Sequence, residues 1–201
     1  MNPLSTAIER LAVNRVLTLK FLDHLALLAA AEARERRTAP REEADRLLAA
    51  DPSGGAAGSL GWNLMHVAVY EEACCSPLPP KLWQRFGHGA EPGVFVAPLV
   101  EIADRLAAAR TALLERVSRW READLERPPQ GTTQPAMSRR EILDAVVWHE
   151  PHHLNVCYDL LRRELTEGES AAGSSPRPAS QARASSASAS NQARAEPRRK
   201  V

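Results

Sequence analysis

The stretch EILDAVVWHEPHHLNVCYDLL, residues 141–161, has the apolar spacing of a helix but carries histidines on its apolar face. Apolar side chains recur every three or four positions, which is typical of a helix that buries one face. The members of that face are Ile142, Val146, His149, His153, Cys157 and Leu160. Burying two imidazoles costs on the order of several kcal/mol unless a partner satisfies them. The stretch therefore predicts a long core helix and a polar partner for His149 and His153.

Two kinds of partner would satisfy these rings. A metal ion can bind both, because histidines one turn apart on a helix can each offer a nitrogen to the same ion. Alternatively, both are core histidines whose hydrogen bonds go to carboxylates or backbone groups. The spacing alone leaves both explanations open.

The rest of the sequence contains three further long helical patterns and no strand pattern. Ala and Leu dominate, and aromatic residues make up only 4% of the chain. The last pattern begins with a capping box, in which the side chains of Ser138 and Glu141 each satisfy the other's backbone N–H. We therefore expect an all-α four-helix bundle. The long helices are predicted over about 4–36, 59–75, 98–125 and 138–165.

The predicted connections differ in length. A short helix should begin at Pro40, and residues 51–59 have the composition of a loop. Residues 76–93 are rich in proline and glycine and predict a long connection with one helical turn around 81–86. A connection of this length in a compact domain is often functional.

Charge divides the chain unevenly. The net charge is +1, but residues 168–201 are basic, rich in Ala, Ser, Pro and Arg, and poor in large apolar side chains. Such a segment cannot offset its ordering entropy. We therefore expect a folded domain over residues 1–167 and a disordered tail over residues 168–201. The mildly acidic body has no electrostatic footprint for nucleic acid, and only the tail would offer one.

Cysteine usage and hydropathy bear on location. The three cysteines are an odd number and include the vicinal pair Cys74 and Cys75, which does not indicate a disulfide framework. No stretch is long and apolar enough to span a bilayer. We expect a cytoplasmic protein without a membrane partner.

A third histidine lies in the second long helix. His66 shares a stripe with Trp62 and Tyr70. Together with His149 and His153 it would supply three nitrogen ligands. Three protein ligands leave positions for water or substrate, as in reactive rather than structural metal sites.

Two segments together resemble the DinB/YfiT-like superfamily: SLGWNLMHVAVYEE, residues 59–72, and SRREILDAVVWHEPHHLNVCYDLLRREL, residues 138–165. Members of that superfamily are four-helix bundles with a histidine in the second helix and an H-x-x-x-H pair in the last long helix. The resemblance covers residues 5–165 and also implies one divalent metal ion (zinc, nickel or iron in different members) and a homodimer. The metal ligands that it implies are His66, His149 and His153.

The resemblance also implies an activity. Better-characterised members transfer or isomerise with low-molecular-weight thiols, and others are described as metal-dependent hydrolases. We accordingly expect the metal to activate a low-molecular-weight thiol, or water, for attack on a small electrophilic substrate. Thiol transfer is preferred, with hydrolysis as the alternative. An alternative of another class is a non-catalytic bundle that binds a ligand or partner and keeps a structural or vestigial metal site.

Two features depart from the superfamily pattern. Residues 154–156 are Leu-Asn-Val, where many members have an Arg-Gly-Gln-like segment. Pro151 removes the helical hydrogen bond to the Val147 carbonyl, at a cost of about 3 kcal/mol, and should kink the helix between the two ligands. Both departures favour the non-catalytic alternative. A kink is expected rather than a break, because the apolar periodicity continues on both sides.

Other side chains near the predicted site have less specific signals. Glu150 and Glu71 are candidates for a base or for support of the ligands, although a solvated helix carboxylate is the commoner case. Cys157 would be either a fourth ligand or a small core residue. Trp62 and Trp148 are expected to line the pocket.

Overall fold

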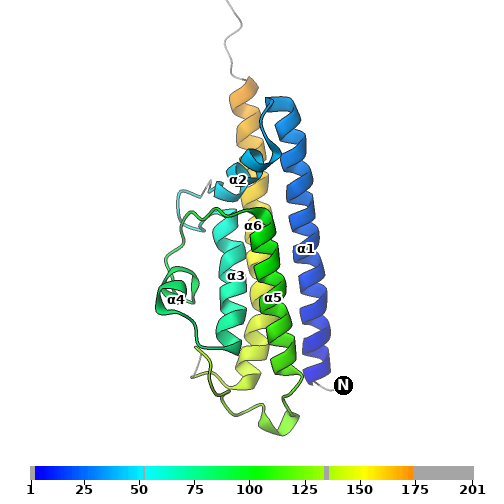
Figure 1. Ribbon diagram of the computed structural model, residues 1–201, viewed down its shortest axis with the longest axis vertical. Helices are drawn as coiled ribbons and strands as arrows, with labels where there is room; N and C mark the ends of the chain where they lie inside the picture. The colour runs from blue at the N-terminus through cyan, green and yellow to red at the C-terminus, as the bar shows by residue number, and fades with distance from the viewer. Residues whose placement is uncertain (1–2, 52, 134–135, 174–201) are drawn as a thin grey trace, which may run out of the picture. The chain divides into compact units, whose positions relative to one another are not determined.

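The computed structural model describes residues 3–51, 53–133 and 136–173. Within these ranges the chain forms six α-helices and one 3₁₀ turn and contains no strand (Figure 1), so the all-α prediction is confirmed. The helices are α1 (Pro3–Arg36), α2 (Pro40–Ala49), α3 (Leu60–Cys75), α4 (Pro80–Phe86), α5 (Leu99–Val117) and α6 (Arg139–Gly173), and the 3₁₀ turn is Glu122–Asp124.

The four longest helices, α1, α3, α5 and α6, lie side by side (Figure 1). Helices α3 and α5 run in the same direction, so the connection between them must return along the length of α3. It ends beside the start of α3, where Ser59 N–H donates to the Gly93 carbonyl at 2.9 Å and Phe95 N–H donates to Ser59 Oγ at 3.1 Å. Gly61 permits this approach, because a Cβ there would lie 2.1 Å from the Phe95 oxygen. The parallel course of α3 and α5 thus explains the length of the connection.

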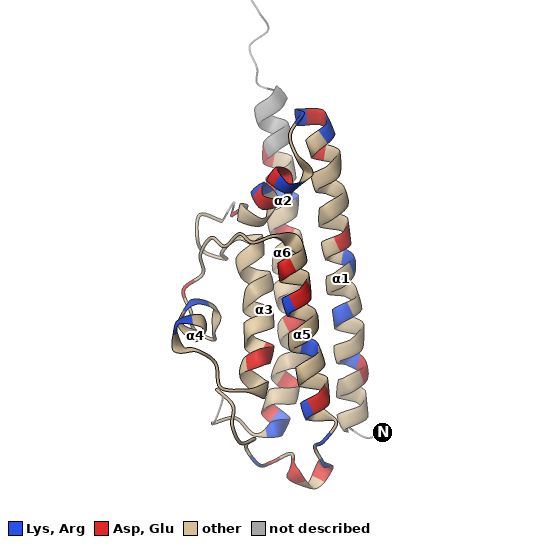
Figure 2. Ribbon diagram, in the orientation of Figure 1, with Lys and Arg blue, Asp and Glu red and all other residues tan. Residues whose placement is uncertain are grey.

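Helix α3 is the most deeply buried of the helices. Almost every residue between Leu60 and Cys74 is buried. Figure 2 shows this helix without basic residues and with acidic ones only toward one end. In the part of the chain that the structure describes, no helix combines the length and apolarity that a bilayer crossing requires.

The helix starts follow the capping signals in the sequence. Trp62 N–H donates to Ser59 Oγ at 3.2 Å and so caps α3. At α6, Ser138 N–H donates to Glu141 Oε2 at 2.7 Å, and Glu141 N–H donates to Ser138 Oγ at 3.2 Å. The predicted capping box is therefore present. Helix α2 begins at Pro40, as expected.

Two predicted helix ends are wrong. Helix α5 ends at Val117 rather than near residue 125, because the following 3₁₀ turn folds back and buries Leu125 in the core. Helix α6 continues to Gly173 instead of ending near residue 165. Residues 168–173, the first of the predicted tail, are therefore helical. They include two alanines and a glutamate, which have high helix propensity. The remainder of the predicted tail, 174–201, lies outside the described residues.

Two separate hydrophobic clusters fill the space between the long helices. The larger one includes Phe21, Leu25, Leu64, Ile102, Leu106, Leu154 and Leu160. The smaller one includes Leu11, Tyr70, Leu113, Val117, Ile142 and Val146. On each long helix, the change from one cluster to the other occurs where buried polar side chains interrupt the apolar stripe.

Those interrupting side chains form a layer of buried charge, to which each long helix contributes one residue: Arg15 (α1), Glu71 (α3), Arg110 (α5) and Glu150 (α6). Arg110 donates to Glu71 Oε1 and to Glu150 Oε2, both at 2.5 Å. Arg15 donates to Glu71 Oε2 at 2.9 Å and lies 3.4 Å from Glu150 Oε1. Two positive and two negative charges are thus paired inside the protein.

Removing one member of this charge layer should destabilise the protein strongly. In Arg110→Met, Glu71 and Glu150 keep only Arg15 as a cationic partner. We expect the free energy of unfolding in urea to fall by about 3–5 kcal/mol, because an incompletely paired charge stays buried.

The matched control is Arg105→Met, also on α5. Arg105 forms a two-pronged ion pair with Glu72 at 2.7 and 2.9 Å, but both side chains are partly exposed. Its loss should cost at most about 1 kcal/mol. Equal losses for the two variants would contradict the special role of the charge layer.

Candidate metal centre

The three predicted histidines meet between α3 and α6. The ring centroids of His66, His149 and His153 lie 4.5–4.8 Å from one another. One nitrogen from each ring can be chosen so that all three lie within 4.8 Å of one another. Helix α6 stays helical through Pro151, so the one-turn spacing of His149 and His153 is preserved. This group could hold a metal ion.

The connection after α3 fixes the proton on His66. Its Nδ1 lies 2.6 Å from the Phe86 carbonyl oxygen, which only accepts hydrogen bonds, so Nδ1 carries the hydrogen. The lone pair of His66 is then on Nε2, which faces Nε2 of His149. Trp62 Nε1–H donates to the neighbouring Arg85 carbonyl at 3.2 Å and anchors the same segment to α3. The long connection therefore orients a candidate ligand.

Asn63 fixes the proton on His153 in the same way. The Asn63 amide nitrogen donates to the carbonyls of Ala57, at 2.8 Å, and Ser59, at 3.0 Å. These bonds turn Asn63 Oδ1 toward His153 Nδ1, at 2.7 Å. Nδ1 must carry the hydrogen, so the Nε2 lone pair of His153 is also free to bind a metal.

His149 completes the group. Its Nε2 lies 2.9 Å from Nε2 of His66, and its buried Nδ1 has no hydrogen-bond partner. Two nitrogens bound to one ion at about 2.0–2.1 Å lie about 3 Å apart. The distance between the two Nε2 atoms is close to this value. Three neutral imidazoles suit zinc, nickel or iron, so the residues present fit a divalent transition-metal ion.

Aromatic rings cover two of the histidines. Trp62 stacks on His66 with 4.9 Å between ring centroids, and Tyr70 stacks on His149 at 4.1 Å. Burial raises the pKa of Tyr70 to about 12, so its hydroxyl stays protonated at neutral pH. Trp62 therefore lines the site, as expected.

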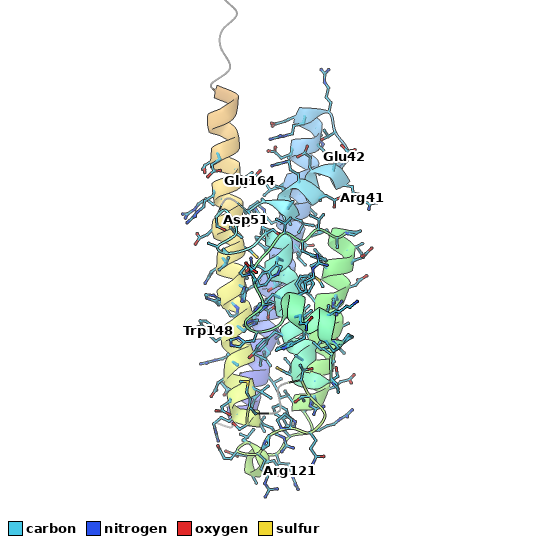
Figure 3. The ribbon with its side chains drawn as sticks, turned by 90° about the vertical axis from the view of Figure 1, so that its left-hand side faces the viewer. Arg41, Glu42, Asp51, Arg121, Trp148 and Glu164 are labelled. Atoms are coloured by element: carbon cyan, nitrogen blue, oxygen red, sulfur yellow. The ribbon has the colours of Figure 1, made fainter. Side chains whose placement is uncertain are left out.

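The prediction for Trp148 is wrong. This side chain is 63% exposed and projects from the outer side of α6 (Figure 3). It stacks on the exposed His152 at 4.7 Å. Successive residues on a helix point about 100° apart, so Trp148 lies about 200° around α6 from the buried Glu150 and faces away from the core.

Glu71 and Glu150 are not solvated helix carboxylates. Each is 1% exposed and belongs to the charge layer. Thr18 Oγ also donates to Glu150 Oε1 at 2.7 Å. A cavity of about 10 Å³ is lined in part by Thr18, Glu150 and His153. Glu150 therefore shares a cavity with His153, and both carboxylates are held by guanidinium groups.

Cys157 packs in the core one turn beyond His153. Its side chain is fully buried, and burial raises the pKa of its thiol. Among the described residues, it does not belong to the group of candidate ligands. The surroundings of Cys157 therefore favour its role as a small core residue over a role as a fourth metal ligand.

Sequence reasoning missed the partners that orient the histidines and balance the charges. Asn63 lies one turn before His66 on the same helix, and Arg110 lies between Leu106 and Leu113 on the inner stripe of α5. A polar residue at an apolar stripe position was the available signal. The Phe86 carbonyl had no such signal, because it is a backbone group contributed by a loop.

Burial keeps the histidines neutral. It is the main cause that lowers the pKa of His149 to about 2 and that of His153 to about 3, and it also lowers the pKa of His66. Neighbouring histidines lower these values further. Neutral imidazoles keep the lone pairs that metal binding needs.

The metal-free protein should lose stability as the pH falls. Between the ordinary histidine pKa of 6.5 and about 3, unfolded chains bind protons that His149 and His153 in the folded protein do not. Each would contribute a slope of at most about 1.4 kcal/mol per pH unit to the free energy of unfolding, and nothing above about pH 7. Urea unfolding with a chelator present, at pH 7 to 4, measures this slope.

Variants identify the source of the slope. A double variant, His149→Gln with His153→Gln, should show a shallower pH dependence than the wild type. The exposed His24 on α1 provides the control, and His24→Gln should leave the dependence unchanged. The free energy of unfolding could instead depend equally on pH in the wild type, the double variant and His24→Gln. That result would show that the imidazoles of His149 and His153 do not stay neutral in the folded protein.

Comparison with known proteins identifies the family of this chain. The family model of the DinB superfamily matches residues 11–157, a span that contains all three histidines and the connection that orients His66. Neither a curated protein nor a solved structure matches the chain significantly. The family match covers well over half of the sequence, and the chain therefore belongs to the DinB superfamily.

Proposed function

We propose that His66, His149 and His153 bind one divalent cation and that the protein is an enzyme acting on a small electrophilic substrate. The nucleophile would be a low-molecular-weight thiol or water. One observation carries the proposal: the Nε2 atoms of His66 and His149 face each other at 2.9 Å, beside the ring of His153. Membership of the DinB superfamily, whose members bind metals, supports it.

The protein's own groups prepare the site. The Phe86 carbonyl and the Asn63 amide oxygen hold the Nδ1–H groups of His66 and His153, which directs their Nε2 atoms to the centre. A bound divalent cation lowers the pKa of a coordinated thiol or water, which supplies a nucleophile at neutral pH. Three protein ligands leave coordination positions for such a small molecule.

The thiol would come from a co-substrate rather than from the chain. Burial raises the pKa of the thiols of Cys74 and Cys157, and it raises that of Cys75 to about 12. These thiols are therefore protonated at neutral pH and poor nucleophiles. A small thiol bound at the metal does not share this restriction.

We assign Glu71 and Glu150 a supporting role. Both carboxylates accept from Arg110, and Arg15 also donates to Glu71. Both carboxylates are thus engaged by guanidinium groups rather than free to act as a base. Their contribution is to hold α3 and α6 in place, so that the histidines on these helices stay aligned. Thiol transfer is preferred to hydrolysis because of the superfamily resemblance, which also suggests a homodimer.

Metal content tests the proposed site. Elemental mass spectrometry of untagged protein, purified without chelator and then reconstituted with zinc, nickel or iron(II), should find about one equivalent of metal. The double variant His149→Ala with His153→Ala should lose it. His152→Ala is the matched control, because His152 lies between these residues in sequence but is exposed. It should bind metal like the wild type, and metal retention by the double variant would overturn the site.

Activity assays on the same proteins separate the chemistries. Consumption of an epoxide by metal-loaded protein should require a small thiol such as dithiothreitol, and it should disappear in the double variant. Turnover of an ester without thiol would indicate hydrolysis. Stoichiometric metal binding without turnover across small thiols, epoxides, esters and amides would instead favour the non-catalytic alternative.

A further inference from the structure

Helix α6 contains a proline between two candidate ligands and yet continues as a helix. Pro151 has no N–H, so the carbonyl of Val147 loses its helical donor. A partly buried carbonyl left without a partner costs free energy and invites water into the helix. Some other group must satisfy it if the turn between His149 and His153 is to keep one shape.

Asn14 on α1 supplies the missing donor. Its side-chain Nδ2–H donates to the Val147 carbonyl at 2.9 Å, across 133 positions of sequence. Two neighbours on α1 contact the same turn of α6: Thr18 Oγ donates to Glu150 Oε1 at 2.7 Å, and Arg15 Nε lies 3.4 Å from that oxygen. Helix α1 therefore holds α6 around Pro151 through Asn14, Arg15 and Thr18.

The same part of α6 also carries two of the candidate metal ligands. His149 approaches His66 at 2.9 Å, and His153 donates to Asn63 on α3 at 2.7 Å. The spacing of these two rings depends on the backbone conformation of α6 at Pro151, because one ring lies before the proline and the other after it. A hydrogen bond that holds this turn in one conformation also holds the two ligands at one distance.

We infer that Asn14 is a positioning residue for the metal centre. It replaces the hydrogen bond that Pro151 removes and so holds His149 and His153 at the spacing that one cation requires. This inference rests on the proposed metal function. It adds a residue on α1, a helix that supplies none of the three ligands.

A double-mutant cycle tests this role. Asn14→Leu keeps approximate size but removes the donor. Pro151→Ala restores a backbone N–H that can donate to Val147, which makes Asn14 dispensable. The dissociation constant for Zn²⁺ is measured in the full-length wild type, both single variants and the double variant, by competition with a chromophoric chelator. Urea unfolding of each metal-free protein is measured in parallel.

We expect Asn14→Leu to weaken zinc binding by about tenfold or more in the wild-type background, the usual effect of losing a residue that orients a ligand. In the Pro151→Ala background, the same substitution should change binding less than about threefold. If Asn14→Leu weakens zinc binding by the same factor with Pro151 and with Ala at position 151, the inference about Asn14 is overturned, while the metal site itself stands. Failure of all four proteins to bind zinc would instead overturn the proposed function.

Folding provides a second readout. If Asn14→Leu does not fold alone, the double variant should recover folding, because the backbone N–H restored by Pro151→Ala satisfies the Val147 carbonyl. Recovery would show the same coupling between Asn14 and Pro151. A double variant that stays unfolded, while Pro151→Ala alone folds, would overturn the inference.

Discussion

Two arginines and two glutamates pair in the interior of this protein, and one comes from each long helix. Buried charges without partners are costly, so the helices must adopt the register in which all four are paired. That register also aligns the histidines. Glu71 follows His66 by little more than one turn on α3, and Glu150 is next to His149 on α6. Pairing the carboxylates with the same guanidinium groups therefore brings the imidazoles together.

The candidate metal centre lies where this charge layer meets the larger hydrophobic cluster. The apolar surroundings keep the imidazoles neutral, and stacking by Trp62 and Tyr70 restricts the rings of His66 and His149, each contact contributing about 0.5–1.5 kcal/mol. Carbonyl oxygens then determine which ring nitrogen carries hydrogen. One of these oxygens, that of Phe86, comes from the long connection that the parallel course of α3 and α5 requires. A feature of topology thus contributes directly to the chemistry of the site.

The sequence predicted the parts of the fold that local patterns control. Apolar spacing indicated the long helices, capping residues indicated their starts, and histidine spacing indicated the three candidate ligands. Long-range partners could not be predicted in this way. The position of Arg110 on an apolar stripe signals burial but not its partners, which are glutamates of two other helices, and Asn63 orients His153 only because α3 and α6 are adjacent. The end of α5 was missed because burial of Leu125, a tertiary effect, outweighs helix propensity.

The central claim is that three histidines bind one ion through Nε2. Proton NMR of the cobalt(II)-substituted protein in water tests it most directly, since the Nδ1–H of each coordinated imidazole gives a strongly shifted, exchangeable signal. The account predicts three such signals. Those of His66 and His153 should exchange most slowly, because Phe86 and Asn63 oxygens accept their hydrogens. Fewer than three signals, or signals that survive removal of His149 and His153, would contradict it.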